Sequence, residues 1–316
     1  MKRIVIIGGG SGTSNLLYGL KNYPLELSAI ISVMDNAGSS GRLRKELNML
    51  PPGDLRQCLL ALSRSAAQPL GTLFRYRFAE GRMQGHNLGN LIIAALAKNL
   101  GFEHAIKQVG ELLKVKGQVI PVTLELADIV ARLKNRTIVG QKQIHQSDLR
   151  TLQTLTLSPI PRANPAALAA IKNAQVIIIA PGDIHSSILP PLLIKSVSRT
   201  LRQSRAQKIL ITNLTTKPRH TDNFAVHDFI ALISRHIGIP DNVVYNSAGL
   251  TDKTLQLQAR KGEKLVEHLS HKNCRCTGAP LINKKFSERI KGDPIERNLI
   301  KHDAARLARL IIRLLK

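Results

Sequence analysis

The first thirteen residues constrain the fold more than any other stretch of the chain. A short apolar run at residues 4–7 ends in a glycine-rich tract at residues 8–13, and Leu16, Leu17 and Leu20 follow at helical spacing. A strand, a glycine loop and a helix in this order form a phosphate-binding device, because the glycines allow a tight turn and the first N–H groups of the helix then face the anion. The candidate phosphate-binding residues are Gly8, Gly9, Gly10, Ser11, Gly12 and Thr13.

The loop matches neither of the two common phosphate-binding sequences. No Gly-Lys-Ser/Thr follows it, so it is not a P-loop, and Thr13 stands where the dinucleotide fingerprint has its third glycine. A glycine-dense turn can also be purely structural. The loop therefore predicts a phosphate-bearing ligand without saying which one.

A second strand is expected at residues 27–33 and leads to Asp35. The spacing of strand, helix and strand is that of a βαβ unit, so we expect a parallel sheet with ligands at the carboxyl ends of its strands, and Asp35 beside the glycine loop. Asp54 precedes an expected helix at residues 55–62. The spacing favours a helix cap for Asp54, and the alternative is that Asp35 and Asp54 hold Mg²⁺ against phosphates.

Composition limits the function classes. The chain has 316 residues, enough for a sizeable core, and no apolar run of membrane-spanning length. Three cysteines and an N-terminus without a signal-peptide core predict a cytoplasmic protein. A net charge of +25 favours phosphorylated small molecules, polyanions or anionic membranes. Only 3% of residues are aromatic, which counts against nucleic-acid binding without excluding it.

Three later segments carry expectations of their own. Alternating apolar residues predict a β-meander at residues 119–147, with a turn at Asn135, appended to the parallel sheet. A basic amphipathic helix ending at Lys316 is expected to dock on the protein rather than on a membrane. Two histidines and two cysteines offer zinc-type ligands, but their spacing is unusual for zinc, and a basic surface loop is the favoured interpretation. They are His268, His271, Cys274 and Cys276.

Several tracts resemble the YvcK/CofD-like family. They are the glycine tract, the tract Gly-Ser-Ser-Gly-Arg-Leu-Arg-Lys-Glu-Leu at residues 38–47, and the tract Leu-Pro-Pro-Gly-Asp-Leu-Arg at residues 50–56. The family includes the bacterial gluconeogenesis factors and the 2-phospho-L-lactate transferases of deazaflavin biosynthesis. The chain is more similar to the gluconeogenesis factors, because it carries the long Ser-Gly-Arg and Pro-Pro-Gly-Asp signature. The resemblance covers nearly the whole chain.

Two further glycine elements belong to this resemblance. The sequence Gly-His-Asn-Leu-Gly-Asn at residues 85–90 is similar to a Gly-His-x-x-Gly-Asn element at a helix start. Residues 180–187 resemble a second glycine site, usually Gly-Pro-Gly-Ser-Leu-Tyr-Thr-Ser. Ala180, Asp183 and His185 replace its first Gly, its Ser and its Tyr. A carboxylate opposes a phosphate, so a ribose or a metal contact suits Asp183 better.

The chain departs from the family pattern at two more places. Residues 213–222 match an Asn-x-x-Thr-x-x-Gly-Glu-Thr-Asp tract, except that Arg219 and His220 replace Gly-Glu. The family often has paired acidic residues where this chain has Asp35 and Asn36. Loss of one carboxylate weakens metal binding and favours a binding role over catalysis.

The resemblance implies a single domain over residues 1–316 with an α/β, Rossmann-like three-layer core, a mostly parallel sheet and a small antiparallel β insertion. It implies a cytoplasmic nucleotide- or UDP-sugar-binding regulator of carbon metabolism and cell shape. Two alternatives stay open: a Mg²⁺-dependent transferase that acts on a nucleotide-activated phosphate substrate, and polyanion or nucleic-acid binding through the basic surface. Self-association is open too, and Mg²⁺ bound with the nucleotide is the one cofactor considered.

The resemblance also carries site residues beyond the glycine tract. Arg42 and Arg44 are expected to neutralise phosphate, while Asp35, Asp54, Asn87 and Asn90 orient the ligand or a metal ion. No catalytic residue is assigned. The full set of expected nucleotide- and phosphate-binding residues outside the glycine tract is Ser39, Ser40, Arg42, Arg44, His86, Asn87, Asn90, Gly182, Ser186, Ser187 and Asn213.

Overall fold

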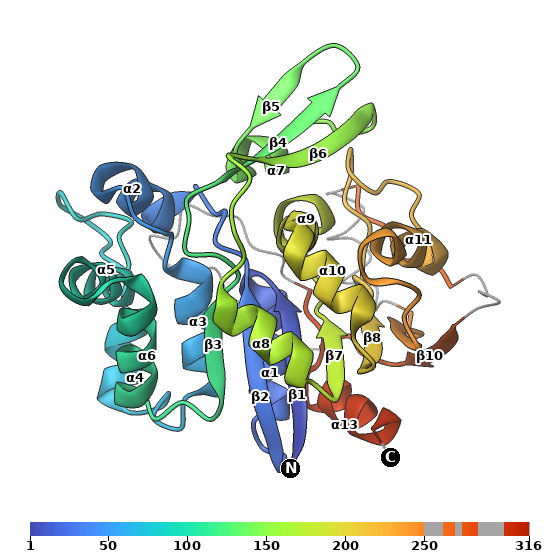
Figure 1. The fold of residues 1–316 in the computed structure, drawn as a ribbon, viewed down its shortest axis with the longest axis horizontal. Helices are drawn as coiled ribbons and strands as arrows, with labels where there is room; N and C mark the ends of the chain where they lie inside the picture. Colours follow the sequence, from blue (N-terminus) through green and yellow to red (C-terminus); the bar gives the residue numbers. More distant parts are fainter. Residues whose placement is uncertain (250–261, 269–273, 284–299, 316) are drawn as a thin grey trace.

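A seven-stranded parallel sheet forms the centre of the fold (Figure 1). The structure is a computed structural model that describes residues 1–249, 262–268, 274–283 and 300–315. The strand order is β10-β9-β8-β7-β1-β2-β3, and each strand pairs in parallel with its neighbours. The strands are β1 (Lys2–Gly8), β2 (Leu25–Ile31), β3 (Gln118–Pro121), β7 (Val176–Ile179), β8 (Gln207–Ile211), β9 (Asn242–Asn246) and β10 (Arg275–Ala279).

The strand order confirms the predicted Rossmann-like α/β fold. The chain adds β2 and β3 on one side of β1, and then β7 to β10 on the other side. Strands β1 and β7 are buried on both faces, which explains why their sequences are runs of Ile and Val rather than alternating patterns. The direction of addition reverses between β1 and β7, and this is where ligands bind in open α/β sheets.

Helices cover both faces of the sheet and make three layers (Figure 1). Helix α1 packs against α3 and α13 on one face, and α10 packs against α8 and α11 on the other. Helix α5 begins at Leu88, inside the tract at residues 85–90 that is expected at a helix start. The helices are α1 (Gly10–Leu20), α2 (Gly38–Leu47), α3 (Gly53–Leu62), α4 (Pro69–Arg75), α5 (Leu88–Leu100), α6 (Phe102–Leu112), α7 (Gln141–Gln146), α8 (Pro165–Asn173), α9 (Leu189–Leu193), α10 (Lys195–Gln203), α11 (Val226–Ile237) and α13 (Ala304–Leu314).

A small antiparallel sheet projects from the carboxyl edge of the main sheet (Figure 1). It consists of β4 (Asp128–Leu133), β5 (Thr137–Val139) and β6 (Leu152–Ser158), in the order β5-β4-β6, and α7 lies between β5 and β6. The turn expected at Asn135 lies between β4 and β5. The expected range of 119–147 differs from this sheet at both ends. At the first end, residues 118–121 pair with β2 and form the edge strand of the parallel sheet, where their apolar side chains are buried. At the other end, the third antiparallel strand begins only at Leu152.

The C-terminal helix α13 docks on α1. Leu307, Ala308 and Ile311 are buried, and the Asp303 side chain caps the helix by accepting a hydrogen bond from the Arg306 N–H at 2.9 Å. The apolar side of this basic helix is therefore used for packing, as expected from the sequence. No helix in the described part of the chain combines the length and the apolar character of a membrane span.

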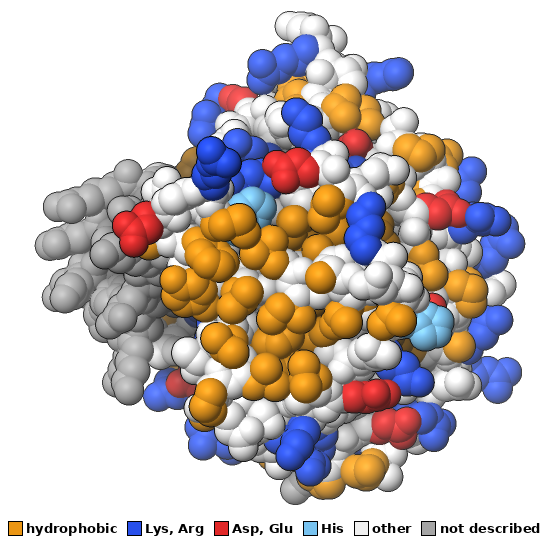
Figure 2. Space-filling view, turned by 90° about the vertical axis from the view of Figure 1, so that its left-hand side faces the viewer, with side chains coloured by type: hydrophobic (Ala, Val, Ile, Leu, Met, Phe, Trp, Pro, Cys, Tyr) orange, Lys and Arg blue, Asp and Glu red, His pale blue; other side chains and the backbone are white. Residues whose placement is uncertain are grey.

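One face of the molecule carries many apolar side chains (Figure 2). It lies over α4, α5 and α6, on the left-hand side of Figure 1. The exposed large hydrophobic residues of these helices are Leu73, Leu100 and Leu112. Exposed apolar surfaces that gather in this way are typical of protein–protein contacts rather than of a fully solvated face.

His302 joins the C-terminal segment to two central elements. Its carbonyl accepts a hydrogen bond from the Asn15 side chain of α1 at 2.7 Å, and its ring bonds the backbone of Thr212, just after β8. The side chain is 6% exposed. Burial lowers the pKa of His302 to about 4, although the bond to Thr212 opposes the shift. The imidazole is therefore neutral in the folded protein.

We expect this histidine to make the fold acid-sensitive. The unfolded chain binds a proton near pH 6.5, whereas the folded chain binds it only near pH 4, so stability falls as the pH drops through this window. The loss from about pH 8 to about pH 5 is roughly 2 kcal/mol for this residue. Urea unfolding at both pH values is expected to show a smaller pH-dependent loss in His302→Gln than in the wild type. The exposed His104→Gln variant is the control, and an unchanged pH dependence in His302→Gln would contradict the assignment.

Candidate functional site

The two central strands each end in a glycine turn at the same edge of the sheet. Gly8 ends β1, Gly9 links it to α1 and Gly10 begins α1, while the loop after β7 contains Gly182. Both strands lie side by side at the point where the strand order reverses. The structure therefore brings the first predicted phosphate loop and the second glycine site to one position.

Helix α1 begins inside the first glycine loop. Gly10 has a φ of +24°, and its helix has neither a side-chain cap nor an acidic residue in its first turn. The N-terminal N–H groups of α1 therefore keep the positive end of the helix dipole available for an anion. Ser11 is exposed at this end, whereas Thr13 is fully buried and its hydroxyl has no hydrogen-bond partner among the described residues.

The two glycine turns touch each other. A Cβ atom placed on Gly12 would lie 1.9 Å from the Pro181 carbonyl oxygen, so only glycine lets α1 approach the loop after β7 so closely. A Cβ atom placed on Gly9 would lie 3.2 Å from Ser187. The Gly182 N–H donates a hydrogen bond to the Asn213 side chain at 2.9 Å, which ties the second turn to the end of β8. Gly182, Ser187 and Asn213 thus gather around the first loop.

Asp54 lies against the first glycine loop and is not the cap residue of α3. Helix α3 begins at Gly53, its cap position is Pro52 without a side-chain bond, and Asp54 falls in the first turn. The helix-cap interpretation is therefore wrong, because the helix begins two residues earlier than expected. Cβ atoms placed on Gly9 and Gly10 would lie 3.2 Å and 3.0 Å from the Asp54 carboxylate oxygens. A negative charge thus lies where the loop is expected to receive phosphate.

Five of the predicted residues form a buried polar cluster between α2 and α5. The Ser39 hydroxyl accepts hydrogen bonds from the Asn87 N–H and the Asn90 side-chain amide, both at 3.2 Å, and lies 3.3 Å from Nδ1 of His86. Arg56 of α3 completes the cluster and donates to Asn90 Oδ1 at 2.7 Å. All of these side chains are less than 8% exposed. The predicted members are Ser39, Ser40, His86, Asn87 and Asn90.

This polar cluster holds helices together rather than facing solvent. Asn87 caps α5 by accepting a hydrogen bond from the Asn90 N–H. Burial and the charge of Arg42 lower the pKa of His86, so its ring is neutral at neutral pH. The cluster meets the glycine loop through the first turn of α3: a Cβ atom on Gly53 would lie 2.2 Å from the Ser40 hydroxyl, and Asp54 is the next residue.

The two expected phosphate-binding arginines contact other parts of the protein. Arg42 donates to the Gln84 carbonyl at 2.8 Å. Arg44 donates to the Ala127 carbonyl at 3.0 Å and forms an ion pair with Asp128 at 2.8 Å, which ties α2 to the start of β4. Arg44 therefore reaches a ligand only if its ion pair with Asp128 breaks. Among the described residues, Arg42 has one hydrogen bond to break, the one to the Gln84 carbonyl.

The expected Mg²⁺ ligands Asp35 and Asp54 occupy different settings. The Asp35 carboxylate accepts a hydrogen bond from the Ala37 N–H at 2.9 Å within its own loop. Asn36 bonds the Lys142 N–H at 2.8 Å and the Gln143 side chain at 3.2 Å, so it positions α7. Where groups of three or more metal-type side chains meet in the described residues, neither Asp35 nor Asp54 takes part. The Mg²⁺ site stays a prediction.

The segment of mixed histidines and cysteines is described only in part. His271 lies outside the described residues, and the His268 ring stacks on Tyr245 with centroids 4.2 Å apart. The sulfurs of Cys274 and Cys276 in β10 are 4.0 Å apart. Burial and the neighbouring thiol raise the pKa of Cys274 to about 11, so this thiol is protonated at neutral pH.

A second charged cluster lies beside the second glycine turn. The Asp183 carboxylate accepts hydrogen bonds from Lys217 Nζ at 2.5 Å and from the Ser186 N–H at 3.0 Å, and it lies 3.0 Å from Nδ1 of His145 in α7. The Ser186 hydroxyl is buried without a hydrogen-bond partner among the described residues. Sequence reasoning missed Lys217 and His145, because neither lies in a glycine motif and His145 comes from α7, between two strands of the insertion.

A family model described as 2-phospho-L-lactate transferase CofD matches residues 4–287. The chain belongs to the CofD family. Within this family it is similar to gluconeogenesis factors of Bacillus subtilis (33% identical, covering 99% of this chain and 98% of the relative) and of Halalkalibacterium halodurans (33% identical, 98% and 96%). A crystal structure of a UPF0052 family member from Bacillus halodurans superposes with a TM-score of 0.89 at 30% identity and covers 99% of this chain and 100% of the other.

These matches confirm the resemblance and the fold that were expected from the sequence. The CofD-family model spans both glycine turns and the inserted sheet. The similarity to the gluconeogenesis factors extends over essentially the full length of each protein.

Proposed function

We propose that this CofD-family protein is a nucleotide- or UDP-sugar-binding regulator of the gluconeogenesis-factor type, linked to carbon metabolism and cell shape and acting in the cytoplasm. One observation carries the proposal: two glycine turns meet at the switch point of the parallel sheet, beside the uncapped N-terminus of α1. A nucleotide diphosphate offers two neighbouring phosphates, which suits two such turns. The names of the full-length relatives support the regulatory part.

Calorimetric titration tests this proposal. The purified protein is titrated with UDP-N-acetylglucosamine, UDP-glucose, GDP and NAD, each with and without Mg²⁺, at moderate salt. Selective binding of a UDP-sugar without turnover is the expected result. Binding of none of the four would contradict the proposal. A salt-steep, sequence-indifferent affinity for DNA in its place would favour polyanion binding through the surface of net charge +25.

The Asp54 carboxylate favours a second candidate, a Mg²⁺-dependent transferase that acts on a nucleotide-activated phosphate. The description of the family model names a 2-phospho-L-lactate transferase. Asp54 lies against Gly9 and Gly10, and a carboxylate beside a phosphate is tolerated when a divalent ion bridges the two. Mg²⁺-dependent turnover of a GDP-linked substrate, lost in Asp35→Asn or Asp54→Asn, would place the transferase first.

Asp54→Asn is expected to remove the Mg²⁺ dependence of nucleotide binding. In the wild type the carboxylate repels phosphate at the loop, so Mg²⁺ is expected to tighten binding by about tenfold. The uncharged amide no longer repels phosphate, so the variant is expected to bind about tenfold more tightly than the wild type without Mg²⁺ and to gain little from the ion. Calorimetry with UDP-glucose and GDP measures both effects.

Glu111→Gln is the matched control, because it removes one negative charge from an exposed side chain of α6 that belongs to neither glycine turn. Its Mg²⁺ dependence is expected to equal that of the wild type. Weaker binding of Asp54→Asn in the absence of Mg²⁺ would contradict the argument, because it would mean that Asp54 contacts the ligand directly through hydrogen bonds.

A further inference from the structure

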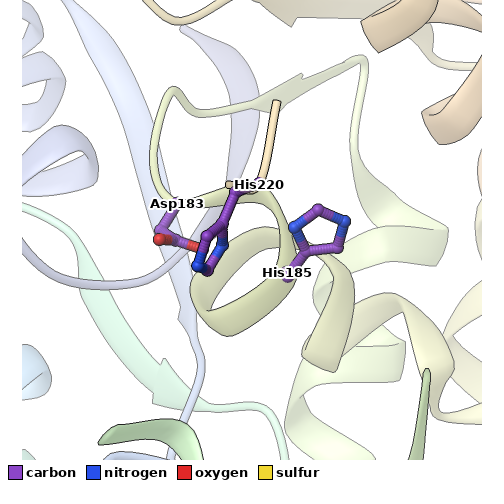
Figure 3. Close-up of side chains that lie close together, drawn as sticks. All are labelled: Asp183, His185 and His220. Atoms are coloured by element: carbon purple, nitrogen blue, oxygen red, sulfur yellow. The ribbon is translucent and has the colours of Figure 1, made fainter. Parts of the chain in front are cut away.

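Two histidines and an aspartate meet beside the second glycine turn (Figure 3). Asp183 and His185 come from the loop after β7, where residues 184–188 form a π-helical turn, and His220 comes from the loop after β8. One ligand-type atom from each side chain lies within 4.8 Å of the others. Figure 3 shows the His220 ring between the Asp183 carboxylate and the His185 ring, whose centroid is 5.7 Å from that of His220.

Both rings are buried and each has a nitrogen without a hydrogen-bond partner. His185 is 6% exposed and His220 is 7% exposed. Nδ1 of each ring is inaccessible and unpartnered among the described residues. A buried polar atom left without a partner costs free energy, so two such atoms beside one carboxylate indicate that the cluster is built for a ligand.

The other nitrogen of His220 is held in the manner of a metal ligand. Nε2 lies 3.0 Å from the Ser147 carbonyl and donates its proton there, because a carbonyl can only accept. The proton on Nε2 leaves the lone pair on Nδ1. Metal-bound histidines are oriented in this way, with the second ring N–H on a backbone carbonyl or a carboxylate.

The protonation states suit metal binding at neutral pH. Burial lowers the pKa of His185, and burial together with the charge of Lys217 lowers that of His220 to about 4, so both rings are neutral. Burial alone would raise the pKa of Asp183, but the hydrogen bond from His145 and the charge of Lys217 hold it well below its usual value. Neutral imidazole and ionised carboxylate are the forms that bind metals.

We propose that Asp183, His185 and His220 form a binding site for a divalent transition metal of the zinc class. Two imidazoles and one carboxylate are the donor set of three-ligand zinc and non-haem iron sites, which keep a position open for water or another ligand. Around a tetrahedral ion such ligand atoms lie about 3.4 Å apart, so small side-chain rotations close the present separations. The set contains two imidazoles, which distinguishes it from an oxygen-ligand Mg²⁺ site.

Lys217 supplies the positive charge beside Asp183 that a bound metal ion would otherwise supply. Its ammonium lies 2.5 Å from Asp183 Oδ2 and also donates to the His145 carbonyl at 2.9 Å. A divalent ion that binds Asp183 must compete with this ammonium, which would keep its contacts with the His145 carbonyl and with Nδ1 of His145, 2.8 Å away. Lys217 therefore sets how tightly the ion binds, and its removal is expected to strengthen metal binding.

Zinc and cobalt titrations of the full chain test the site. The experiment uses a Cys274→Ser/Cys276→Ser background, so that the thiol pair in β10 contributes nothing. We expect one equivalent of Zn²⁺ by calorimetry and visible Co²⁺ bands of a tetrahedral site. His185→Gln and His220→Gln are expected to weaken binding by about a hundredfold or more. The exposed His104→Gln variant is expected to bind as the background does.

Lys217→Met gives a test in the opposite direction. Zn²⁺ affinity is expected to rise by about tenfold, because the competing cation is gone, and Zn²⁺ is expected to raise the melting temperature more than in the background. Thermal melting of each metal-free variant checks that it is folded. The proposal is overturned if the background binds no Zn²⁺, or if folded His185→Gln and His220→Gln bind it as tightly as the background. Metal binding that disappears when the cysteines are replaced would assign the metal to β10 instead.

Discussion

Gly12→Ala is expected to lower the free energy of unfolding by about 3 kcal/mol and to weaken nucleotide binding strongly. The added methyl group would lie 1.9 Å from the Pro181 carbonyl oxygen, which is backbone and cannot rotate away. Helix α1 must then move from the loop after β7, and the two glycine turns separate. Urea denaturation measures the stability, and calorimetry with the ligand that the wild type binds measures the affinity.

Gly110→Ala is the matched control for this substitution. Gly110 also lies inside a helix, α6, but its added methyl group would meet only Leu59 at an ordinary contact distance of 3.6 Å. Alanine is a better helix former than glycine, so this variant is expected to be as stable as the wild type or more stable by up to about 1 kcal/mol. Equal stability of Gly12→Ala and Gly110→Ala would show that α1 and the loop after β7 are not held in contact.

The central fold could be predicted from the sequence because its signals are local. The run of β-branched residues in β1, the glycine loop and the helix that follows lie within twenty residues of the N-terminus. The helix that ends at Gly101 also carries its stop signal in the sequence. The place of β3 in the parallel sheet was harder to predict from the sequence. Most of its residues belong to the apolar stretch that predicted the meander, and only its pairing with β2, which lies far away in sequence, places it in the parallel sheet.

The sequence could predict that the two glycine turns meet at one edge of the sheet, but not which of the other expected residues are buried in contacts with each other. Sequence tracts bring the glycine loop, Asp54 and the second glycine turn to one edge of the sheet, and the structure places them together. The polar residues Ser39, Asn87 and Asn90 belong to the same tracts, but they are buried and bonded to each other. A sequence motif marks the residues of a site. It does not distinguish the residues that face a ligand from the residues that hold the surrounding helices in place.

The cluster around Asp183 could not be predicted from the sequence, because its side chains come from three separate segments of the chain. Asp183 and His185 follow β7, His220 follows β8, and His145 belongs to α7, between β5 and β6 of the insertion. The sequence did hold one signal: Asp183, His185 and His220 all stand where the chain departs from the family pattern. Three departures that meet in space are easier to explain as one local feature of this chain than as three independent changes.

Arg56→Leu is expected to destabilise the protein by about 3 kcal/mol. Arg56 is 6% exposed, and it donates to Asn90 Oδ1 at 2.7 Å and to the Phe74 carbonyl at 2.8 Å. Leucine fills part of the volume but donates no hydrogen bond, so two buried acceptors lose their donor. Each loss costs about 1–3 kcal/mol. The exposed Arg82→Leu, which removes the same charge, is expected to change the free energy of unfolding by less than about 0.5 kcal/mol.

A double-mutant cycle with Asn90→Ala decides whether this cluster acts as one unit. If Arg56 and Asn90 stabilise the protein through their shared bond, the double variant is expected to lose about 1 kcal/mol less than the sum of the single losses. Additive losses would contradict this. The cycle also bears on function, because Asn90→Ala would weaken ligand binding by loosening α3 and Asp54 even if Asn90 never contacts the ligand. Weaker binding by an Asn90 variant therefore identifies a ligand contact only when its free energy of unfolding equals that of the wild type.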